Sequence, residues 1–587
     1  MLWWLEMENK DHVTPAKPIP GAIIPPKRPL LPTVPARSEI TKPGEPFTNS
    51  CSTDAEEIAK LPTQGIDLGW PNERMKWKRL TENAMKWFDG APRPSTGNVV
   101  VPYIYGRCAF DDIAEALATA ISSDHRIYLV GWWYEPDTPM KNPLVGDPPV
   151  NTLLQDYLKN TKAQVRGLFW NSPLKGRDGD NKKIADFINS LPNGAALEDA
   201  KLIEVKLPNR LWLPNIHHQK LIVVSGVFGL VAFLGGMDVN KTRVNVFGNM
   251  PLHDVHVRLN GPSAAEALSI FRDRWMDHPS TPELDSAKFQ MNPDDVRQDF
   301  IRVAASKSEV MDTCTVPGGK VKPRGMLVSI GRTFPNLAKF KPGDSYRFKN
   351  PDQSAWQLVK NGITNAKEFI YIEDQYLVSR RVKDLLVEKL KEPNFKFLLI
   401  LMGNSKAFED KGAGEFPYLI GVRNEFRTDF AKVDPGRKKW RMFSLKQTTD
   451  SGRRPWCGEF VHSKLWIVDD QYVAVGSANC DDRGYTYDTE IMAGITEEPI
   501  ERAAGGRFAR DLRIALWRKH LGLDHSHFVN FAVGLKHWLT LPASAMVFDS
   551  SDLEESSLLN DTKGLTRDDP TANFRWTHWL DPDADKL

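Results

Sequence analysis

Apolar and polar positions along the chain follow two periods, one typical of helices and one typical of strands. From Phe110 to Ser122 the apolar residues recur every three or four positions, which predicts an amphipathic helix, and the next run, Arg126–Trp133, is apolar enough for a buried strand. The same order returns later, where a helical pattern over Ser354–Ala366 precedes a strand-like run over Phe369–Tyr376. Helices that alternate with strands indicate an α/β fold.

Further strand-like runs follow each of these units, at Val165–Trp170 and at Phe395–Met402. The apolar stretch from Leu221 to Met237 approaches the length of a membrane span, but glycines interrupt it. Valine, phenylalanine and leucine dominate its pieces, so we interpret it as two buried strands joined by a tight turn.

The repeat extends to two short motifs that contain histidine and lysine. His218-Gln-Lys220 and His462-Ser-Lys464 each precede a run of apolar residues, and the two histidines are 244 residues apart. A single His-X-Lys is more often a structural feature, but two copies at matching places favour a shared site. A period this long predicts two duplicated domains.

We expect the chain to divide into five parts. These are a Pro-rich N-terminal arm with a helical extension over residues 1–97, a first lobe over 98–290, a connecting segment over 291–345, a second lobe over 346–525 and a C-terminal tail over 526–587. Ten prolines lie between residues 15 and 46, which predicts an extended segment, either a disordered linker or a docking arm for a partner.

Composition limits the classes of function. The 77 basic and 75 acidic residues leave a formal charge of +2, which argues against a surface built throughout to neutralise nucleic acid, although a local basic cleft is compatible with it. The five cysteines are widely spaced and show neither a zinc-type cluster nor a disulfide scaffold. The apolar start, Met1–Leu5, is too short for the core of a classical signal peptide, so we expect synthesis in the cytoplasm without one.

The two motifs supply chemistry that suits a phosphodiester. Alternate residues of a strand point to the same face, so His218 lies beside Lys220 and His462 lies beside Lys464. One imidazole can attack phosphorus while the other protonates the leaving oxygen. The ammonium groups stabilise the charge that develops on the phosphate oxygens. This scheme requires no metal and no other cofactor.

These motifs resemble those of the phospholipase D superfamily, which carries a duplicated His-X-Lys-X4-Asp motif. The copy from His462 to Asp469 matches in full, as does the run from Gly476 to Glu490, whereas the first copy has Ser225 where the motif has aspartate. In the family this aspartate supports structure more than phosphate chemistry. The resemblance covers residues 98–525 and implies an α/β fold of two homologous lobes, each a mixed β-sheet flanked by helices, packed as a pseudo-dimer.

The resemblance also implies a phosphohistidine mechanism and a set of site residues. His218 is expected to be the nucleophile and His462 the general acid. Asp254 and Glu490 resemble the acidic residues that bond to the imidazoles and fix their tautomers. The residues expected to bind the phosphate oxygens are Lys220, Lys464, Asn240 and Asn479.

Further residues are candidates for contact with the substrate. Ser477 either helps to position the site or is a small residue chosen for packing. The aromatic residues either line an acyl or head-group channel or belong to the core, and they are Trp132, Trp133, Tyr376 and Trp456. Arg453 and Arg454 either attract anionic lipid or lie in a solvated loop.

Three other histidines are near the motifs in sequence. Strand alternation turns His217 away from His218, so we interpret it as structural. His253 and His256 flank Asp254 and would suggest a metal site, but they fall on opposite faces of a strand, and we expect no metal there.

The leading hypothesis is a phospholipase D that hydrolyses a membrane glycerophospholipid to phosphatidic acid and a free alcohol, with alcohol transfer as an accompanying reaction. The alternatives are a phosphodiesterase or nuclease of the same superfamily, and an inactive scaffold, which Ser225 suggests. We expect no nucleic acid partner.

The Pro-rich arm and the run Trp576–Pro582 are similar to those of bacterial phospholipase D effectors delivered by type VI secretion. This similarity implies secretion into target cells, towards the periplasm or the membrane surface. It also implies a secretion-apparatus partner that binds the arm, and an immunity protein.

Overall fold

The computed structural model describes residues 82–141, 152–171, 178–199, 202–205, 211–214, 216–227, 229–243, 252–278, 325–334, 351–404, 417–446, 460–499, 502 and 507–554. Trp456, Arg453, Arg454, the Pro-rich arm and Trp576–Pro582 lie outside these ranges.

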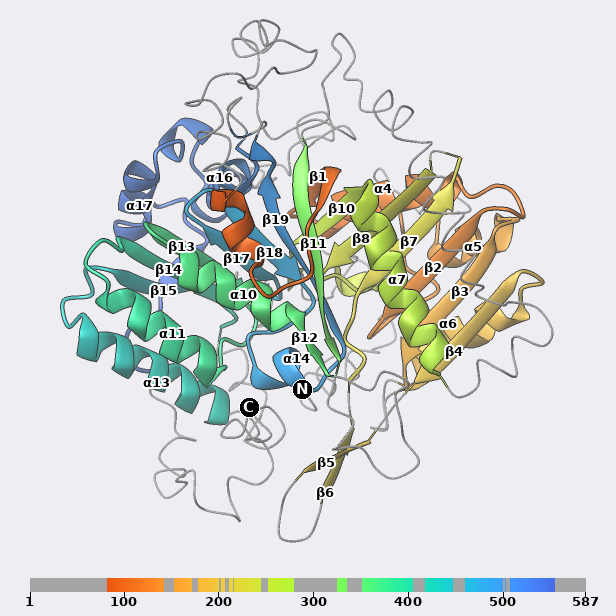
Figure 1. Cartoon of the computed structure of the whole chain (residues 1–587), viewed down its shortest axis with the longest axis horizontal. Coiled ribbons are helices and arrows are strands. Elements are labelled where there is room, and N and C mark those ends of the chain that lie inside the picture. The colour runs from red at the N-terminus through yellow and green to blue at the C-terminus, as the bar shows by residue number, and fades with distance from the viewer. Residues whose placement is uncertain are drawn as a thin grey trace, which may run out of the picture.

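A mixed sheet of 16 strands runs across the molecule (Figure 1). At its centre β1 (Ser95–Tyr103) and β11 (Met326–Phe334) pair in antiparallel orientation. Outward from β1 the order is β10-β8-β7-β2-β3-β4, and outward from β11 it is β19-β18-β17-β13-β14-β15-β20. On both sides antiparallel strands lead to a parallel trio, β2-β3-β4 or β13-β14-β15. The sheet is therefore two homologous lobes in a pseudo-dimer about the β1–β11 seam, as the repeat predicts.

The strands of the first lobe are β2 (Arg126–Gly131), β3 (Gln164–Trp170), β4 (Gly194–Asp199), β7 (Leu221–Gly226), β8 (Gly229–Gly235) and β10 (His256–Asn260). The strands of the second lobe are β13 (Phe369–Asp374), β14 (Phe397–Met402), β15 (Trp440–Leu445), β17 (Lys464–Val468), β18 (Tyr472–Gly476), β19 (Glu490–Glu497) and β20 (Val547–Asp549). Shorter pairs are β5 (Leu202–Val205) with β6 (Leu211–Pro214), β9 (Leu252–His253) with β16 (Phe460–Val461), and β12 (Asp352–Gln353) with β11.

Helices cover both lobes. In Figure 1, α7 lies in front of the first lobe, and α10, α11 and α13 lie in front of the second. The helices of the first lobe are α4 (Gly106–Ala118), α5 (Leu154–Asn160), α6 (Asp178–Ser190) and α7 (Pro262–Asp277). Those of the second are α10 (Ser354–Asn365), α11 (Arg380–Lys391), α13 (Pro417–Val433), α14 (Asp482–Thr486), α16 (Phe508–Leu521) and α17 (Phe531–Leu539). Short 3-10 helices are η1 (Lys86–Phe88), η2 (Lys241–Arg243) and η4 (His525–His527).

The apolar stretch from Leu221 to Met237 forms the β7–β8 hairpin, as its glycines predict. Every residue of β7 is buried, because the sheet is covered on both faces. Among the described helices, none combines the length and apolar character needed to cross a membrane.

The segment predicted as a C-terminal tail continues the second lobe as far as the structure describes it. Strand β20 pairs with β15, and the buried Trp538 of α17 packs on Phe443 and Trp517. Phe531 stacks on Phe369 of β13 with ring centroids 3.8 Å apart. Phe531, Trp538 and Val547 of this segment therefore extend the core of the second lobe.

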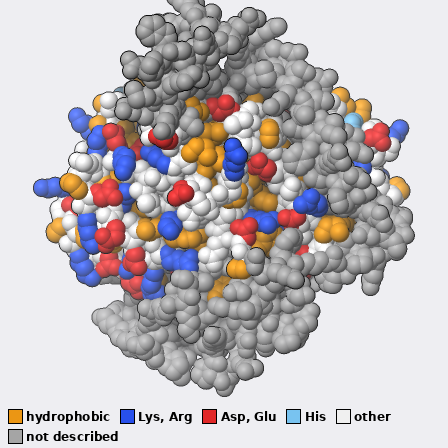
Figure 2. Space-filling view, viewed as in Figure 1, with side chains coloured by type: hydrophobic (Ala, Val, Ile, Leu, Met, Phe, Trp, Pro, Cys, Tyr) orange, Lys and Arg blue, Asp and Glu red, His pale blue; other side chains and the backbone are white. Residues whose placement is uncertain are grey.

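Charged side chains of both signs are interspersed over the visible face of the second lobe (Figure 2). That mixture agrees with the balanced composition, because neither sign dominates the face seen in this view.

Candidate active site

The two His-X-Lys motifs lie where the lobes meet. The backbone N–H of His218 donates to the carbonyl of Thr489 over 3.0 Å, and that of His462 donates to the carbonyl of His253 over 2.8 Å. The parallel pairing of β9 with β16 and a bridge between His217 and Thr489 flank these bonds. Each motif histidine is therefore anchored by the backbone of the opposite lobe.

Each histidine bonds to an acidic residue of the opposite lobe as well. His218 Nδ1 lies 2.9 Å from Glu490 Oε1, and His462 Nδ1 lies 2.8 Å from Asp254 Oδ2. In sequence each acidic residue follows the histidine of its own lobe, but β19 begins at the seam and presents Glu490 across it. Both pairs are thus crossed, and neither lobe holds a complete histidine–acid pair.

The hydrogen bonds assign the tautomers of the two rings. Nδ1–H of His218 donates to Glu490 Oε1 and approaches the carbonyl of Ser477 at 3.1 Å, so the lone pair is on Nε2. His462 Nδ1 also lies 3.2 Å from Lys464 Nζ, but this nitrogen cannot donate to Asp254 and accept from an ammonium at once. The carboxylate is the stronger partner, so Nδ1–H donates to Asp254. Lys464 donates instead to the carbonyl of His462 and to Gln375 Oε1.

The two lysines have different partners. Lys220 Nζ lies 3.1 Å from Asp238 Oδ2, whereas Lys464 Nζ donates to the neutral amide of Gln375 over 3.0 Å. Burial lowers the pKa of both ammonium groups, and that of Lys464 falls to about 8. Lys464 is therefore a buried cation without a carboxylate at hydrogen-bonding distance.

Burial and charge also act on the histidines and their acidic partners. Burial, with the adjacent lysines, holds the pKa of His218 and of His462 well below the usual range, so both rings are neutral near pH 7. Burial raises the pKa of Asp254 to about 6 against the opposing charges of Lys464 and Arg243. Burial likewise raises the pKa of Glu490.

The two candidate asparagines are not equivalent. Asn240 Oδ1 accepts from the backbone N–H and the hydroxyl of Thr242, and Asn240 Nδ2 lies 3.5 Å from the carbonyl of Trp133. Asn479 is buried, and its Oδ1 has no hydrogen-bond partner among the described residues. A turn of the first lobe thus engages Asn240, whereas no equivalent contact within the described residues engages Oδ1 of Asn479.

Of the other candidates, Ser477 and Trp132 lie beside His218. The Ser477 hydroxyl donates to Glu490 Oε2, which orients that carboxylate. The rings of Trp132 and His218 have centroids 5.8 Å apart, and Lys220 Nζ lies 5.6 Å from the Trp132 ring. Tyr376 is buried in the core of the second lobe.

A second buried cluster lies behind His462. Glu373 Oε2 is 2.7 Å from His253 Nε2, and its Oε1 is 2.9 Å from His520 Nε2. The ligand atoms of these three residues lie within 4.8 Å of one another, close enough for one metal ion. Tyr371 and Ser463 also donate to Glu373, so protein donors already satisfy the carboxylate.

The remaining two histidines near the motifs have other partners. His217 Nε2 lies 2.8 Å from Asp199, and its Nδ1 lies 2.7 Å from Thr489, which fits a structural role at the contact between lobes. His256 Nδ1 lies 3.4 Å from the backbone N–H of Met237. His253, Asp254 and His256 therefore do not form one cluster, because each side chain has different partners.

Residues 359–512 match a family model described as a cardiolipin synthase, phospholipase D-like domain. The chain is 24% identical to phospholipase D zeta 2 of Arabidopsis thaliana, over 73% of this chain and 54% of the relative. It is 23% identical to phospholipase D2 of Bos taurus, over 72% and 52%, and 21% identical to cardiolipin synthase 2 of Staphylococcus epidermidis, over 78% and 77%. Together with the duplicated motifs, these matches support the phospholipase D superfamily.

The chain is similar to proteins of the phospholipase D superfamily. It spans about half the length of the Arabidopsis and bovine phospholipases D that it matches. Among solved structures, a phosphatidylserine synthase of Haemophilus influenzae Rd KW20 is 14% identical with a TM-score of 0.47, over 79% of this chain and 98% of that chain.

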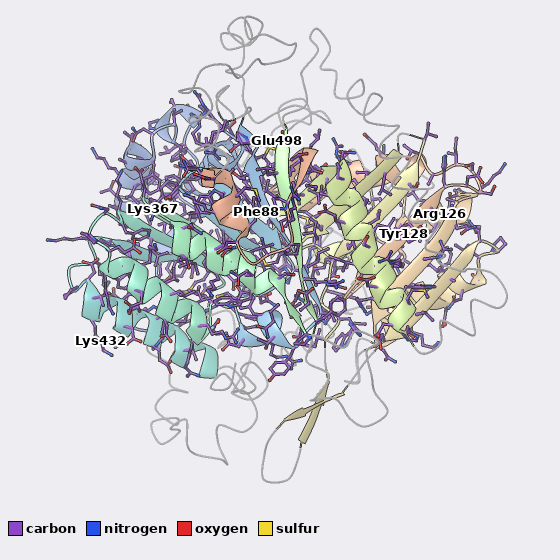
Figure 3. The ribbon with its side chains drawn as sticks, in the orientation of Figure 1. Phe88, Arg126, Tyr128, Lys367, Lys432 and Glu498 are labelled. Atoms are coloured by element: carbon purple, nitrogen blue, oxygen red, sulfur yellow. The ribbon has the colours of Figure 1, made fainter. Side chains whose placement is uncertain are left out.

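The aspartate of the second His-X-Lys-X4-Asp motif, Asp469, lies far from the histidines. Asp469 follows the end of β17, and its carboxylate accepts from the backbone N–H groups of Lys367, Glu368 and Phe369 over 2.7–2.8 Å. Ser225 of the first lobe lies near the end of β7, opposite Arg126 of β2. Figure 3 places Lys367 and Arg126 on the outer parts of their lobes, away from the seam. The position at which serine replaces the motif aspartate, Ser225, is thus remote from His218.

Three further polar residues of the superfamily site were not singled out by the sequence reasoning. Gln375 accepts from Lys464, Asp238 pairs with Lys220, and Arg243 lies 3.9 Å from Asp254. Asp238 follows the Gly-Gly turn after β8, and Gln375 ends a run typical of the family. The positions of Asp238 and Gln375 in the sequence were the signals from which their place in the site could have been predicted.

Proposed function

We propose that this protein hydrolyses the head-group phosphodiester bond of a glycerophospholipid, which yields phosphatidic acid and a free alcohol. The main support is the crossed arrangement of two neutral imidazoles, each oriented by a carboxylate of the opposite lobe, with a lysine beside each. Such a site supplies a nucleophile, a proton donor and positive charge for the phosphate oxygens.

In the first half-reaction, Nε2 of His218 attacks phosphorus. A P–N bond forms, and the P–O bond to the head-group alcohol breaks. The protonated His462 gives its proton to the departing oxygen. Glu490 stabilises the cationic ring of the phosphohistidine, because its carboxylate accepts from Nδ1–H.

In the second half-reaction, neutral His462 takes a proton from water. The water oxygen attacks phosphorus, the P–N bond breaks, and the electron pair returns to His218. Asp254 stabilises the resulting His462 imidazolium, which is then ready for the next cycle.

The substrate itself supports protonation of His462. Without a ligand both rings are neutral near pH 7, because burial and two lysines disfavour the imidazolium and hold its pKa low. A phosphodiester brings a negative charge between the lysines, which raises the pKa of the imidazole beside Asp254. Lys220, Lys464 and Asn479 bind the phosphate oxygens, and a contact from Asn240 requires its turn to give up a hydrogen bond.

A second candidate function is transfer of the phosphatidyl group to an alcohol instead of water. Similarity to a cardiolipin synthase over more than three quarters of both chains favours it. The chemistry differs only in the acceptor, since His462 can deprotonate an alcohol as it deprotonates water. The ratio of phosphatidic acid to transfer product, measured with added glycerol, separates the two.

The test is release of free alcohol from vesicles that contain phosphatidylcholine, phosphatidylethanolamine and phosphatidylglycerol. His218→Ala and His462→Ala are expected to abolish release while each variant remains folded at the assay temperature. His525→Ala, in η4, is the matched control and should retain activity. Near-normal release by both motif variants would refute the site, and cleavage of single-stranded DNA without lipid turnover would favour the nuclease alternative.

We further propose that the protein is a secreted effector whose Pro-rich arm binds a secretion apparatus and which an immunity protein neutralises. The support is the sequence resemblance alone, because the arm lies outside the described residues. Deletion of residues 1–46 should leave hydrolysis intact and abolish export. Unchanged export would contradict this assignment.

A further inference from the structure

Arg243 is a buried cation at the seam that the proposed chemistry does not use. It ends η2, directly after the turn that holds Asn240, and its side chain is 0% exposed, which matches the burial of Lys464. Its Nη1 donates to the Thr242 hydroxyl over 3.1 Å. Its Nε and Nη2 make no hydrogen bond within the described part of the chain. Buried guanidinium donors that make no hydrogen bond cost free energy. We therefore expect Nε and Nη2 of Arg243 to donate to a bound acceptor.

The nearest carboxylates are too far away to be that partner. Nε lies 3.9 Å from Asp254 Oδ2, and Nη2 lies 4.0 Å from Asp238 Oδ2, both beyond hydrogen-bonding distance. Asp254 already holds His462, and Asp238 already holds Lys220. Nε and Nη2 of Arg243 therefore lie within the site, between Asp254 and Asp238.

At the corresponding turn of the second lobe, the described residues include no arginine with unsatisfied donors like those of Arg243. The turn after Asn479 leads into α14, where Arg483 donates to both carboxylate oxygens of Asp488 over 3.1 and 2.6 Å. That arginine is neutralised by its own lobe. The first lobe thus contributes a positive charge that the duplication does not supply twice, and the site is asymmetric in charge.

The charged side chains around the expected phosphate position indicate how much negative charge a bound ligand should carry. Lys220 has the carboxylate of Asp238 at 3.1 Å, whereas Lys464 and Arg243 have no carboxylate at hydrogen-bonding distance. Arg243 has the nearest carboxylates only at 3.9–4.0 Å, so its Nε and Nη2 can still donate to a ligand, and together with Lys464 it favours a group with two negative charges. A phosphodiester carries one negative charge, but the five-coordinate transition state and a phosphomonoester product each carry close to two.

We propose that Arg243 is a further substrate-binding residue, whose Nε and Nη2 donate to two phosphate oxygens and favour the doubly charged forms. This assignment rests on the proposed function. It implies that Arg243 contributes more to the transition state than to the bound substrate, so its loss lowers kcat more than it raises KM. It also implies that a simple dianionic phosphate binds to the site.

The experiment uses Arg243→Gln, Arg243→Lys and the control Lys241→Gln. Lys241 lies two residues before Arg243 in η2, carries the same charge and forms an ion pair with Asp137 at the surface. Binding of inorganic phosphate is measured by titration calorimetry on the full chain, and kcat and KM are measured with a soluble phosphodiester. Arg243→Gln should weaken phosphate binding about 10- to 100-fold, as expected for a lost charge-assisted hydrogen bond. Arg243→Lys should recover part of the affinity, and Lys241→Gln should match wild type.

Equal phosphate affinity in wild type and a folded Arg243→Gln variant would overturn the proposal, as would absence of phosphate binding by wild type. If that variant does not fold, a crystal structure of wild type with inorganic phosphate decides, with the ion expected on Nε and Nη2 of Arg243. An ion bound elsewhere would overturn the proposal. Arg243-dependent phosphate binding without lipid turnover would retain the anion site and reject the proposed hydrolysis.

Discussion

Replacement of Asp254 by asparagine tests the crossed pairing most directly. The amide keeps the volume of the side chain but removes the charge that faces His462 Nδ1 over 2.8 Å in a buried site. A hydrogen bond to a charged partner contributes about 1.5–3 kcal/mol, and about 1.4 kcal/mol corresponds to a factor of ten. Loss of the stabilised His462 imidazolium should therefore lower kcat about 10- to 100-fold.

The same variant should change the pH dependence. Burial raises the pKa of Asp254 to about 6, so the carboxylate is charged above that pH and becomes neutral as the pH falls through it. Wild-type activity should accordingly decline below about pH 6. An amide does not titrate, so Asp254→Asn should lack this decline. The assay is kcat/KM against pH with a soluble phosphodiester, because this ratio reports the pKa values of the free protein.

Nuclear magnetic resonance of nitrogen-labelled histidine identifies the ring that is affected. The Nδ1–H signal of His462 should move in Asp254→Asn while that of His218 stays, and Glu490→Gln should give the reverse. A shift of His218 alone in Asp254→Asn, or an unchanged decline of its activity at low pH, would refute the crossed assignment.

Three other predictions concern charge and support around the site. Burial lowers the pKa of Lys464 to about 8, so activity should fall as this ammonium loses its proton above pH 8, and Lys464→Arg should move that decline to higher pH in the same profile. Glu373→Gln leaves two buried histidines without their carboxylate and should reduce the free energy of unfolding by about 3–5 kcal/mol in urea titration; an unchanged midpoint would contradict this role. Asp469→Ser removes a carboxylate that accepts three backbone N–H groups and should cost about 1–3 kcal/mol of stability while kcat per folded molecule stays at the wild-type value, whereas a loss of kcat alone would imply a direct part in the chemistry.

The repeated pattern along the chain was sufficient to predict the two lobes. Apolar runs and glycines located the β7–β8 hairpin and the strands that follow the motif histidines, β7 and β17, because burial on both faces produces continuous apolar segments. The histidines and lysines were recognisable because they recur together. These features depend on local sequence, so a single chain reveals them.

Contacts across the seam could not be predicted in the same way. The pairing of Asp254 with His462 depends on how two lobes face each other, since the two residues lie 208 positions apart. Asn240 and Asn479 occupy comparable turns, yet only the first is held by a neighbouring threonine. The role of Trp132 beside His218 likewise depends on tertiary packing.

The continuous sheet restricts how the two lobes can move relative to each other. Strands β1 and β11 pair at the seam, Asn98 of β1 donates to the carbonyl of Met326, and Gly97 donates to Glu498, which Figure 3 labels near one end of the seam. A hinge motion that separated the lobes would break this backbone pairing. The spacing of the two imidazoles should therefore remain constant through both half-reactions, and entry of the substrate should depend on rearrangement outside the sheet. The β1–β11 pairing therefore argues against closure of one lobe on the other as a step in the proposed reaction.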